Sequence, residues 1–253
     1  MRYLITFSYD GSKYFGYQKQ KGVNSVQEDL EKVLSLINNK PVSVCASGRT
    51  DAGVHANGQC AHFDIDISIT PDKLKNALNG LLNGNIYVKS VVEVPDTFHA
   101  RFDVKQKEYI YKINTGEYSP IYKDYIYQYC KPLDVDSMKT AIKSFEGEHN
   151  FKSFTKANVE TNNFARTIYS TAVTKDNDKY ICLENSWISQ GKNIIYDNVI
   201  DILNVLIDSY PRMYKIDSMD RSKIEVYKYD KPVPGLSFNE FSDYVRGQEK
   251  INI

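Results

Sequence analysis

The chain has 253 residues, of which 42% are hydrophobic and 25% are charged, and its 32 basic residues balance its 32 acidic ones. This length can bury a sizeable core in one large domain or in two small ones. A zero net charge excludes a strongly basic or acidic protein, although a basic cleft can be balanced by acidic surface elsewhere. We expect neither a signal peptide nor contact with a membrane, because a polar strand pattern begins at residue 3 and no apolar run is long enough to cross a bilayer.

The cysteines and histidines show no spacing that is typical of a metal site. The cysteines lie far apart along the chain and none belongs to a C-x-x-C pair: Cys45, Cys60, Cys130 and Cys182. We therefore expect reduced thiols, without disulfides or zinc, in a cytoplasmic protein.

In the first part of the chain, hydrophobic periodicity predicts a strand, a loop and a helix. Side chains alternate along residues 3–10 and place one face together, at Tyr3, Ile5, Phe7 and Tyr9. The glycine-punctuated, basic stretch 11–22 is typical of a loop. Ser25 and Glu28 form a capping box, and the helix after it carries one apolar stripe, at Val26, Leu30, Val33, Leu34 and Ile37.

Two further strands are predicted on either side of residue 50, over residues 42–46 and 60–67. The second of them has an apolar face at Ala61, Phe63, Ile65 and Ile67, and a polar face at His62, Asp64 and Asp66. Thr70 and Pro71 begin a helix whose apolar stripe comprises Leu74, Ala77, Leu78 and Leu81. A strand over residues 86–94 and a polar crossing over 98–106 follow.

In the second part, strands are predicted at 108–114 and 124–130, a hairpin at 166–185 and a last helix at 195–206. Asp134 or Asp136 caps a helix that Gly147 closes, with apolar side chains at Met138, Ala141, Ile142 and Phe145. This order of elements predicts an α+β fold with two related halves, residues 1–102 and 103–253. Each half is expected to be an antiparallel-rich mixed sheet with helices on one face.

The loop Ser47–Ala56, SGRTDAGVHA, holds the strongest candidate for chemistry. It is compatible with a plain hairpin turn, but it also presents the carboxylate of Asp51 together with the guanidinium of Arg49. A nearby positive charge keeps an aspartate ionised. Such a carboxylate can act as a nucleophile or a base without a metal.

Two other groups of residues have alternative interpretations. A basic-aromatic cluster near the N-terminus is either a solvated loop or a set of phosphate and stacking contacts for RNA: Lys13, Tyr14, Tyr17, Gln18, Lys19 and Lys21. The segment FHAR, which ends at Arg101 and precedes Lys105 and Lys107, raises the same question, while His99 alone is more typical of a structural histidine. Asp64 and Asp66 resemble the D-x-D-x-[TS] motif of metal-dependent phosphotransferases, but we interpret them as the solvated face of a strand.

These motifs together resemble the TruA-type tRNA pseudouridine synthases over essentially the whole chain. GRTDAGVHANGQCAHF is similar to the catalytic motif of that family nearly letter for letter. Weaker family motifs resemble SYDGSKYFGYQKQ, SVQEDLEKVL, FHARFDVKQKEYIYKI, FEGEHNFKSF and PVPGLSF. The resemblance implies the pseudouridine synthase fold, with two sheets joined across a central RNA-binding cleft, in a homodimer.

The resemblance also implies an enzyme that isomerises uridine to pseudouridine without a cofactor, in the anticodon stem-loop of tRNA (tRNA positions 38–40). Asp51 matches the catalytic aspartate, Arg49 the arginine that fills the helix once the uridine is flipped out, and Tyr109 the tyrosine that stacks on the extruded base. How the carboxylate breaks the glycosidic bond is left open: by adding to the sugar, adding to the base or removing a sugar proton. The implied RNA contacts are Lys13, Tyr14, Gln18, Lys19, Lys21, His55, Arg101 and Arg166.

The chain departs from the family pattern at several positions. Tyr17 replaces a tryptophan, and Asn150 replaces an aspartate. The family segment F-L-x-x-M-V-R-N-I-V-G reads WISQGKNII, so Lys192 is the cation nearest to the arginine that pairs with the catalytic carboxylate, and it offers charge without a bidentate fork. The alternatives are a divergent relative that modifies another RNA such as ribosomal RNA, a catalytically silent RNA-binding or chaperone protein, and a metal-dependent phosphotransferase.

Overall fold

The computed structural model describes residues 1–154, 164–176, 180–187, 213–216 and 224–227. The described residues fall into two compact units, the first comprising Met1–Lys105 and the second beginning at Gln106. Lys192, the predicted helix at 195–206 and the segment PVPGLSF lie outside the described residues. Among the residues described, no helix combines the length and the apolar character that crossing a membrane requires.

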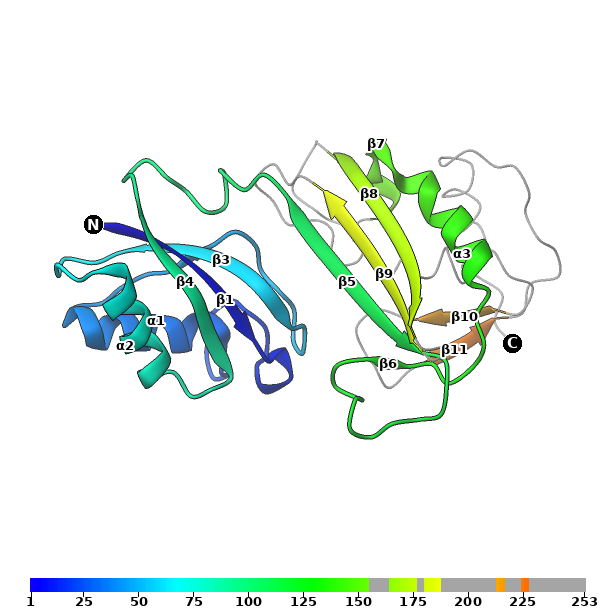
Figure 1. Cartoon of the computed structure of the whole chain (residues 1–253), viewed down its shortest axis with the longest axis horizontal. Helices are drawn as coiled ribbons and strands as arrows, with labels where there is room; N and C mark the ends of the chain where they lie inside the picture. The colour runs from blue at the N-terminus through cyan, green and yellow to red at the C-terminus, as the bar shows by residue number, and fades with distance from the viewer. Residues whose placement is uncertain (155–163, 177–179, 188–212, 217–223, 228–253) are drawn as a thin grey trace. The chain divides into compact units, whose positions relative to one another are not determined.

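The first unit is a four-stranded antiparallel sheet in the order β2-β3-β1-β4, with two helices on one face (Figure 1). The strands are β1 (Arg2–Tyr9), β2 (Cys45–Ala46), β3 (Ala56–Asp64) and β4 (Ile86–Val94). The helices are α1 (Val26–Asn38) and α2 (Pro71–Leu81). A short 3-10 turn, η1 (Gly11–Lys13), follows β1 after one residue, its N-cap Asp10.

The core of this unit lies between the helices and the sheet, where the predicted apolar faces meet. The side chains predicted to share one face of β1 are all buried: Tyr3, Ile5, Phe7 and Tyr9. The stripes of the two helices pack against that face, through Val26, Leu30, Leu34, Leu74 and Leu78. The period-2 pattern of the strand and the helical stripes are therefore confirmed, because each follows from burying one side of a regular element.

The starts of both helices follow the predicted signals. The hydroxyl of Ser25 accepts a hydrogen bond from the Glu28 amide at 3.3 Å and caps α1. Pro71 occupies the first turn of α2 after Thr70, whose side chain makes no capping bond. The end of α2 differs from the prediction, since Leu81 is exposed and Leu82, one residue beyond the helix, is buried in its place.

Two strand predictions in this unit need correction. The strand expected at 42–46 is regular only over Cys45–Ala46. His62, expected on a polar face, is buried. Its face of the sheet is covered by the turn at 98–102, whose Phe98 and His99 rings lie 6.3 and 4.8 Å from the His62 ring.

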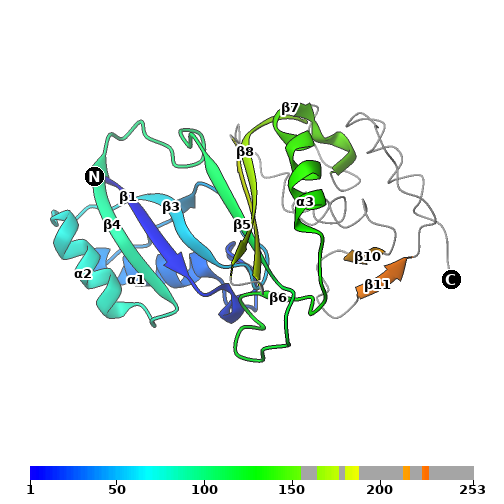
Figure 2. The ribbon, with the colours of Figure 1, turned by 45° about the vertical axis from the view of Figure 1, so that its right-hand side comes forward.

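The second unit contains a five-stranded sheet in the order β6-β5-β9-β8-β7, antiparallel except for the β5–β6 pair. Its strands are β5 (Lys107–Asn114), β6 (Tyr127–Gln128), β7 (Gly147–Asn150), β8 (Ala165–Asp176) and β9 (Tyr180–Trp187). The helix α3 (Val135–Ile142) lies beside β8, as Figure 2 shows. A separate two-stranded pair joins β10 (Met213–Ile216) and β11 (Ile224–Tyr227). The expected mixed α/β content with antiparallel sheets is therefore confirmed.

The core of the second unit also follows the predicted pattern. Met138, Ile142 and Phe145 are buried against Ile113, Ile168 and Ile181 of the sheet. Asp134 is the N-cap of α3 and accepts from the amides of Asp136 and Ser137, which decides between the two predicted caps. The helix ends at Ile142 rather than near Gly147, which begins β7. The strand expected at 124–130 is reduced to Tyr127–Gln128.

Candidate active site

The Asp51 loop, residues 47–55, connects β2 to β3 in the first unit. Its first residues are fixed at the base of the hairpin, where the Ser47 amide donates to the Cys60 carbonyl at 2.8 Å. The Ser47 hydroxyl donates to Oε1 of Gln59 at 2.8 Å, and Nε2 of Gln59 donates to the Gly48 carbonyl at 3.0 Å. Hydrogen bonds of the buried Ser47 and of Gln59 therefore fix the start of the loop to the sheet.

The end of β1 and the segment that follows it form hydrogen bonds with the same loop next to Asp51. The hydroxyls of Tyr9 and Thr50 lie 2.7 Å apart, and the Tyr17 amide donates to the Thr50 carbonyl at 2.9 Å. The Gly53 amide donates to the Tyr14 carbonyl at 3.3 Å. Hydrogen bonds thus hold the residues on both sides of Asp51, while its own side chain is half-buried and Arg49 is exposed.

Two glycines of the stretch YDGSKYFGYQ allow this close packing. A Cβ atom on Gly11 would lie 2.0 Å from the carbonyl oxygen of Val54. Gly16 has φ +100°, and a Cβ atom there would lie 3.0 Å from the carbonyl oxygen of Thr50. Residues with a side chain would push the Asp51 loop away at both points.

The phenols beneath the loop are neutral at physiological pH. Burial raises the pKa of Tyr9 to about 12, against smaller opposing effects of hydrogen bonds with Thr50 and Gln59. Burial also raises the pKa of Tyr17, whose ring lies 6.4 Å from that of Tyr9. The loop that carries Asp51 is therefore supported by protonated hydroxyl groups and receives no negative charge from them.

His55 ends the Asp51 loop and ties it to the turn after β1. Its Nδ1 lies 3.2 Å from the Gly11 amide nitrogen and 3.2 Å from Oδ1 of Asp10. Without a proton, Nδ1 accepts from Gly11; with one, it donates to Asp10. The predicted contact of His55 with RNA stays a prediction.

The predicted basic-aromatic cluster is divided by the structure. Lys13, Gln18, Lys19 and Lys21 are exposed, and Lys19 forms an ion pair with Glu31 at 3.3 Å. Tyr14 is buried and its hydroxyl donates to Oδ2 of Asp29 at 2.9 Å. The ring of Tyr14 belongs to the core of the first unit, and its predicted contact with RNA stays a prediction.

The remaining predicted RNA contacts differ in exposure. Arg101 is half-buried in the turn at 98–103 of the first unit. In the second unit, Tyr109 lies half-buried on β5 and packs against the core. Arg166 on β8 is buried, a guanidinium Nη1 donates to the Ala165 carbonyl, and burial lowers the pKa of its side chain. A buried guanidinium reaches a phosphate only if the surrounding residues move.

The phosphotransferase interpretation is contradicted by the placement of its two aspartates. Asp64 is exposed at the end of β3, in an antiparallel sheet, and forms a bidentate pair with Arg2 at 2.9 and 2.8 Å. Asp66 is exposed and pairs with Lys40 at 2.8 Å. The motif requires a buried parallel strand, so the predicted solvated face is confirmed.

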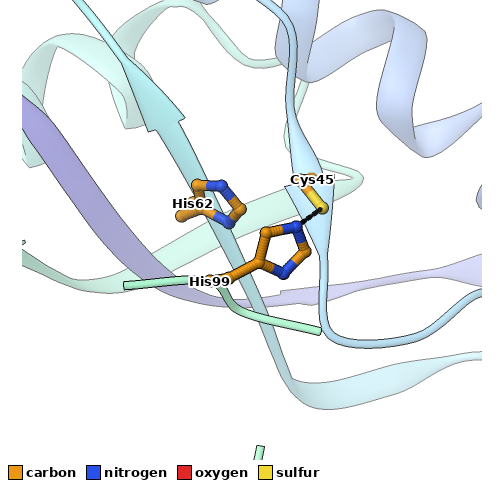
Figure 3. Close-up of side chains that lie close together, drawn as sticks. All are labelled: Cys45, His62 and His99. Carbon is orange, nitrogen blue, oxygen red and sulfur yellow. Dashed lines mark hydrogen bonds between the residues drawn. The ribbon is translucent and has the colours of Figure 1, made fainter. Parts of the chain in front are cut away.

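One cluster of reactive side chains was missed by sequence reasoning, because its members come from three distant segments. The Sγ atom of Cys45 and ring nitrogens of His62 and His99 lie within 4.8 Å of one another, a grouping that can in principle hold a metal ion (Figure 3). Nε2 of His99 lies 3.7 Å from Sγ of Cys45. Cys45, Cys60 and Cys130 are free thiols, and the side chain of Cys182 lies outside the described residues.

Comparison with known proteins defines the class to which this fold and loop belong. The sequence profile of the family described as tRNA pseudouridine synthase matches residues 5–103 and 141–208, which include most of β1, the Asp51 loop and the strands β7, β8 and β9. The chain therefore belongs to the tRNA pseudouridine synthase family.

Individual relatives named tRNA pseudouridine synthase A match this chain over most of their length. A tRNA pseudouridine synthase A of Geobacillus sp. (strain WCH70) is 40% identical over 223 residues, covering 87% of this chain and 88% of that protein. The protein of that name from Limosilactobacillus fermentum is 43% identical over 232 residues, covering 88% and 90% of the two chains. The one from Malacoplasma penetrans is 44% identical over 209 residues, covering 82% and 83%.

Proposed function

We propose that this protein is an RNA pseudouridine synthase that isomerises uridine in the anticodon stem-loop of tRNA, with Asp51 as the catalytic carboxylate. Membership of the family and the names of the relatives support the reaction and the substrate. The observation that carries the proposal is the half-buried carboxylate of Asp51, on a loop whose neighbouring residue Thr50 is held by Tyr9 and Tyr17. A preorganised carboxylate is what a substitution at a sugar carbon or a pyrimidine ring requires.

The chemistry of the reaction needs no co-reactant. The N1–C1′ glycosidic bond of uridine breaks and a C5–C1′ bond forms in its place. The proton on C5 leaves and N1 gains a proton, so the product is an isomer of the substrate and no electrons or groups are consumed. An ionised Asp51 supplies the nucleophile or base, and we therefore propose that no cofactor takes part.

The proposed roles of the other residues follow from the need to reach the base. C5 and C1′ are inaccessible inside a helical stack, so the uridine must be flipped out. In this proposal, the exposed Arg49 occupies the space that the uridine leaves, and Tyr109 stacks on the extruded base, a contact worth about 1–3 kcal/mol. Lys192 pairs with the catalytic carboxylate in place of the family arginine.

The RNA backbone is proposed to contact the exposed basic residues that follow β1, Lys13, Lys19 and Lys21, together with Gln18. Arg101, Arg166 and His55 are proposed as further contacts, in which the two arginines bring positive charge. The halves 1–102 and 103–253 are proposed to be related in architecture and to bind RNA in a cleft between them, in a cytoplasmic homodimer. These last features are supported by the family resemblance alone.

The proposal is tested with tRNA transcripts that carry tritium on C5 of uridine. Because C5 loses its proton in the reaction, wild-type protein should release tritium to water without added metal and in the presence of a chelator. Asp51→Asn should reduce the release at least about a thousandfold while tRNA binding stays within about twofold. Asp66→Asn is the matched control, because it makes the same change at an exposed aspartate two residues after β3. This variant should remain active.

A second candidate substrate is favoured by one departure from the family. The segment 187–195, WISQGKNII, lacks the arginine of the family motif. A relative with an altered pairing partner can act on another RNA, such as ribosomal RNA. Pseudouridine mapping of total RNA from cells with and without this gene distinguishes the candidates, because it reports every modified uridine at once.

A further inference from the structure

The turn at 98–103 carries Arg101 and is held tightly against the first sheet. Ala100 is buried, and Nη1 of Arg2 donates to the Phe98 carbonyl at 2.9 Å. The His99 amide donates to Oδ2 of Asp103 at 2.7 Å, and the Asp103 amide returns a bond to the His99 carbonyl at 2.9 Å. These bonds close the turn on itself and tie its start to β1.

Two histidine rings bind consecutive amides within this turn. Nδ1 of His62 accepts from the Ala100 amide at 3.1 Å, and Nδ1 of His99 accepts from the Arg101 amide at 3.2 Å. A ring nitrogen that accepts carries no proton, so both imidazoles are neutral and each has its proton on Nε2, as the hydrogen-bond network assigns it. Protonation of either Nδ1 would break its bond to the turn.

Three side chains contact the ring of His99 in this arrangement. The ring stacks on Phe102 with centroids 4.2 Å apart, and its centroid lies 4.8 Å from that of the tilted His62 ring. Nε2 faces the sulfur of Cys45 at 3.7 Å (Figure 3). The Cys45 thiol therefore closes the end of the ring opposite to the Arg101 amide.

The turn lies beside the strand that leads into the Asp51 loop, because Nε2 of His99 is 3.7 Å from Sγ of Cys45, two residues before Ser47. Burial raises the pKa of the Tyr17 hydroxyl, and the positive charge of Arg101 opposes this effect. The Tyr17 amide in turn donates to the carbonyl of Thr50, the residue before Asp51. Arg101 therefore belongs to the same compact unit as Asp51, on a turn that contacts the strand from which the Asp51 loop begins.

We propose that His62 and His99 are positioning residues for the isomerisation, which as neutral imidazoles fix the backbone at Ala100 and Arg101 and so hold the Arg101 guanidinium where it meets an RNA phosphate beside the Asp51 loop. This inference rests on the proposed function. The histidines touch neither substrate nor reacting atoms, and they act only through Arg101.

A metal site formed by Cys45, His62 and His99 is the competing explanation of the same cluster, and the hydrogen bonds disfavour it. A neutral histidine that binds a metal through Nε2 must carry its proton on Nδ1 and usually donates that proton to a carbonyl or carboxylate. Here Nδ1 of each ring faces a backbone N–H donor. If Nε2 bound a metal, the proton on Nδ1 would face the backbone N–H of Ala100 or Arg101 at each ring, and the existing hydrogen bond could not form.

The test compares two substitutions of His99 that place a side-chain amide at different distances from the backbone. In His99→Asn, the amide oxygen takes the place of Nδ1 and can accept from Arg101; in His99→Gln, the amide reaches the place of Nε2 and cannot. We expect His99→Gln to lower kcat/KM for tritium release about tenfold and His99→Asn to stay within about twofold of wild type. Equal losses in the two variants would overturn the proposal. The same pair at His62 gives this contrast if His99→Gln does not fold.

A double-variant comparison separates positioning from a general structural role. If His99 acts through Arg101, then His99→Gln should change kcat/KM less than about twofold in an Arg101→Ala background. Multiplying effects would overturn the proposal. If Asp51→Asn remains active, the proposed function fails, whereas an inactive Asp51→Asn with equivalent His99 variants rejects the positioning role alone.

The metal explanation is tested by titrating the purified protein with Co²⁺. A thiolate–cobalt absorption band that disappears in Cys45→Ser would show that the cluster binds metal and would overturn the assignment of both Nδ1 atoms as acceptors. We expect no such band, and its absence supports the hydrogen-bonded arrangement.

Discussion

The hydroxyl of Tyr9 lies 2.7 Å from the hydroxyl of Thr50, the residue directly before Asp51. Tyr9 is the last residue of β1, and it is buried beneath the loop. One of the two inner strands of the sheet therefore contacts the loop of the candidate catalytic residue through the Tyr9 hydroxyl. This relationship links the position of Asp51 to the most buried part of the first unit.

Removing the Tyr9 hydroxyl should lower kcat as well as the free energy of unfolding. Tyr9→Phe keeps the ring and loses the bond to Thr50, so we expect about 1 kcal/mol less stability and a kcat about tenfold lower. Tyr3→Phe is the matched control, because it loses an equivalent bond of 2.7 Å to the Ile69 carbonyl, away from the loop. Denaturant unfolding and tritium-release kinetics measure the two effects. Equal kcat values for both variants would contradict the role of Tyr9.

Adding a methyl group at Gly11 should displace the Asp51 loop. The new Cβ atom would lie 2.0 Å from the Val54 carbonyl oxygen, so the backbone of one segment must move. We expect Gly11→Ala to cost about 1–3 kcal/mol of stability and to lower kcat at least about tenfold. Gly58→Ala serves as the control, since nothing lies within 4 Å of a Cβ atom there. A fully active Gly11→Ala would show that the loop tolerates the displacement.

Acid should destabilise the first unit through His62. Burial, aided by the positive charge of Arg2 and by the neighbouring His99 and opposed by Asp64 and the Cys45 backbone, lowers the pKa of His62 below its ordinary value of 6.5. As pH falls below about 6.5, the unfolded chain binds a proton that the folded protein binds only at lower pH, so stability is lost across this window. His62→Asn keeps an acceptor for the Ala100 amide and does not titrate.

The measurement for this third prediction is urea unfolding of both proteins at about pH 7.5 and about pH 5. Wild type should lose more stability between the two conditions than His62→Asn. An identical loss in the two proteins would mean that other groups cause the acid sensitivity.

The cap of α1 should contribute measurably to stability without affecting chemistry. Ser25 is fully buried and its hydroxyl accepts from the Glu28 amide, so Ser25→Ala should cost about 1 kcal/mol. Thr70 occupies the same position of α2 but makes no capping bond, and Thr70→Ala should cost less than about 0.5 kcal/mol. Thermal unfolding of the two variants checks the difference. Similar losses would indicate that the hydroxyl bond is not the source of the effect.

Local sequence signals predicted the regular elements well where one face of an element is buried. The alternation of Tyr3, Ile5, Phe7 and Tyr9, and the capping serine of α1, depend on residues two to four positions apart. The loop of Asp51 was recognised from its letters alone. Predictions failed where an element ends or where distant chain covers it, as at Leu81 and His62.

By itself, the sequence determined the alternating strands, the helical stripes and the family, because each of these is encoded in neighbouring positions or in a contiguous motif. Only the tertiary structure decided that Tyr14 is a core residue and that Cys45, His62 and His99 meet. It also decided that Tyr9 and Tyr17 support Thr50. These contacts join segments tens of residues apart, and they form only when the sheet packs, so no periodicity along the chain can encode them.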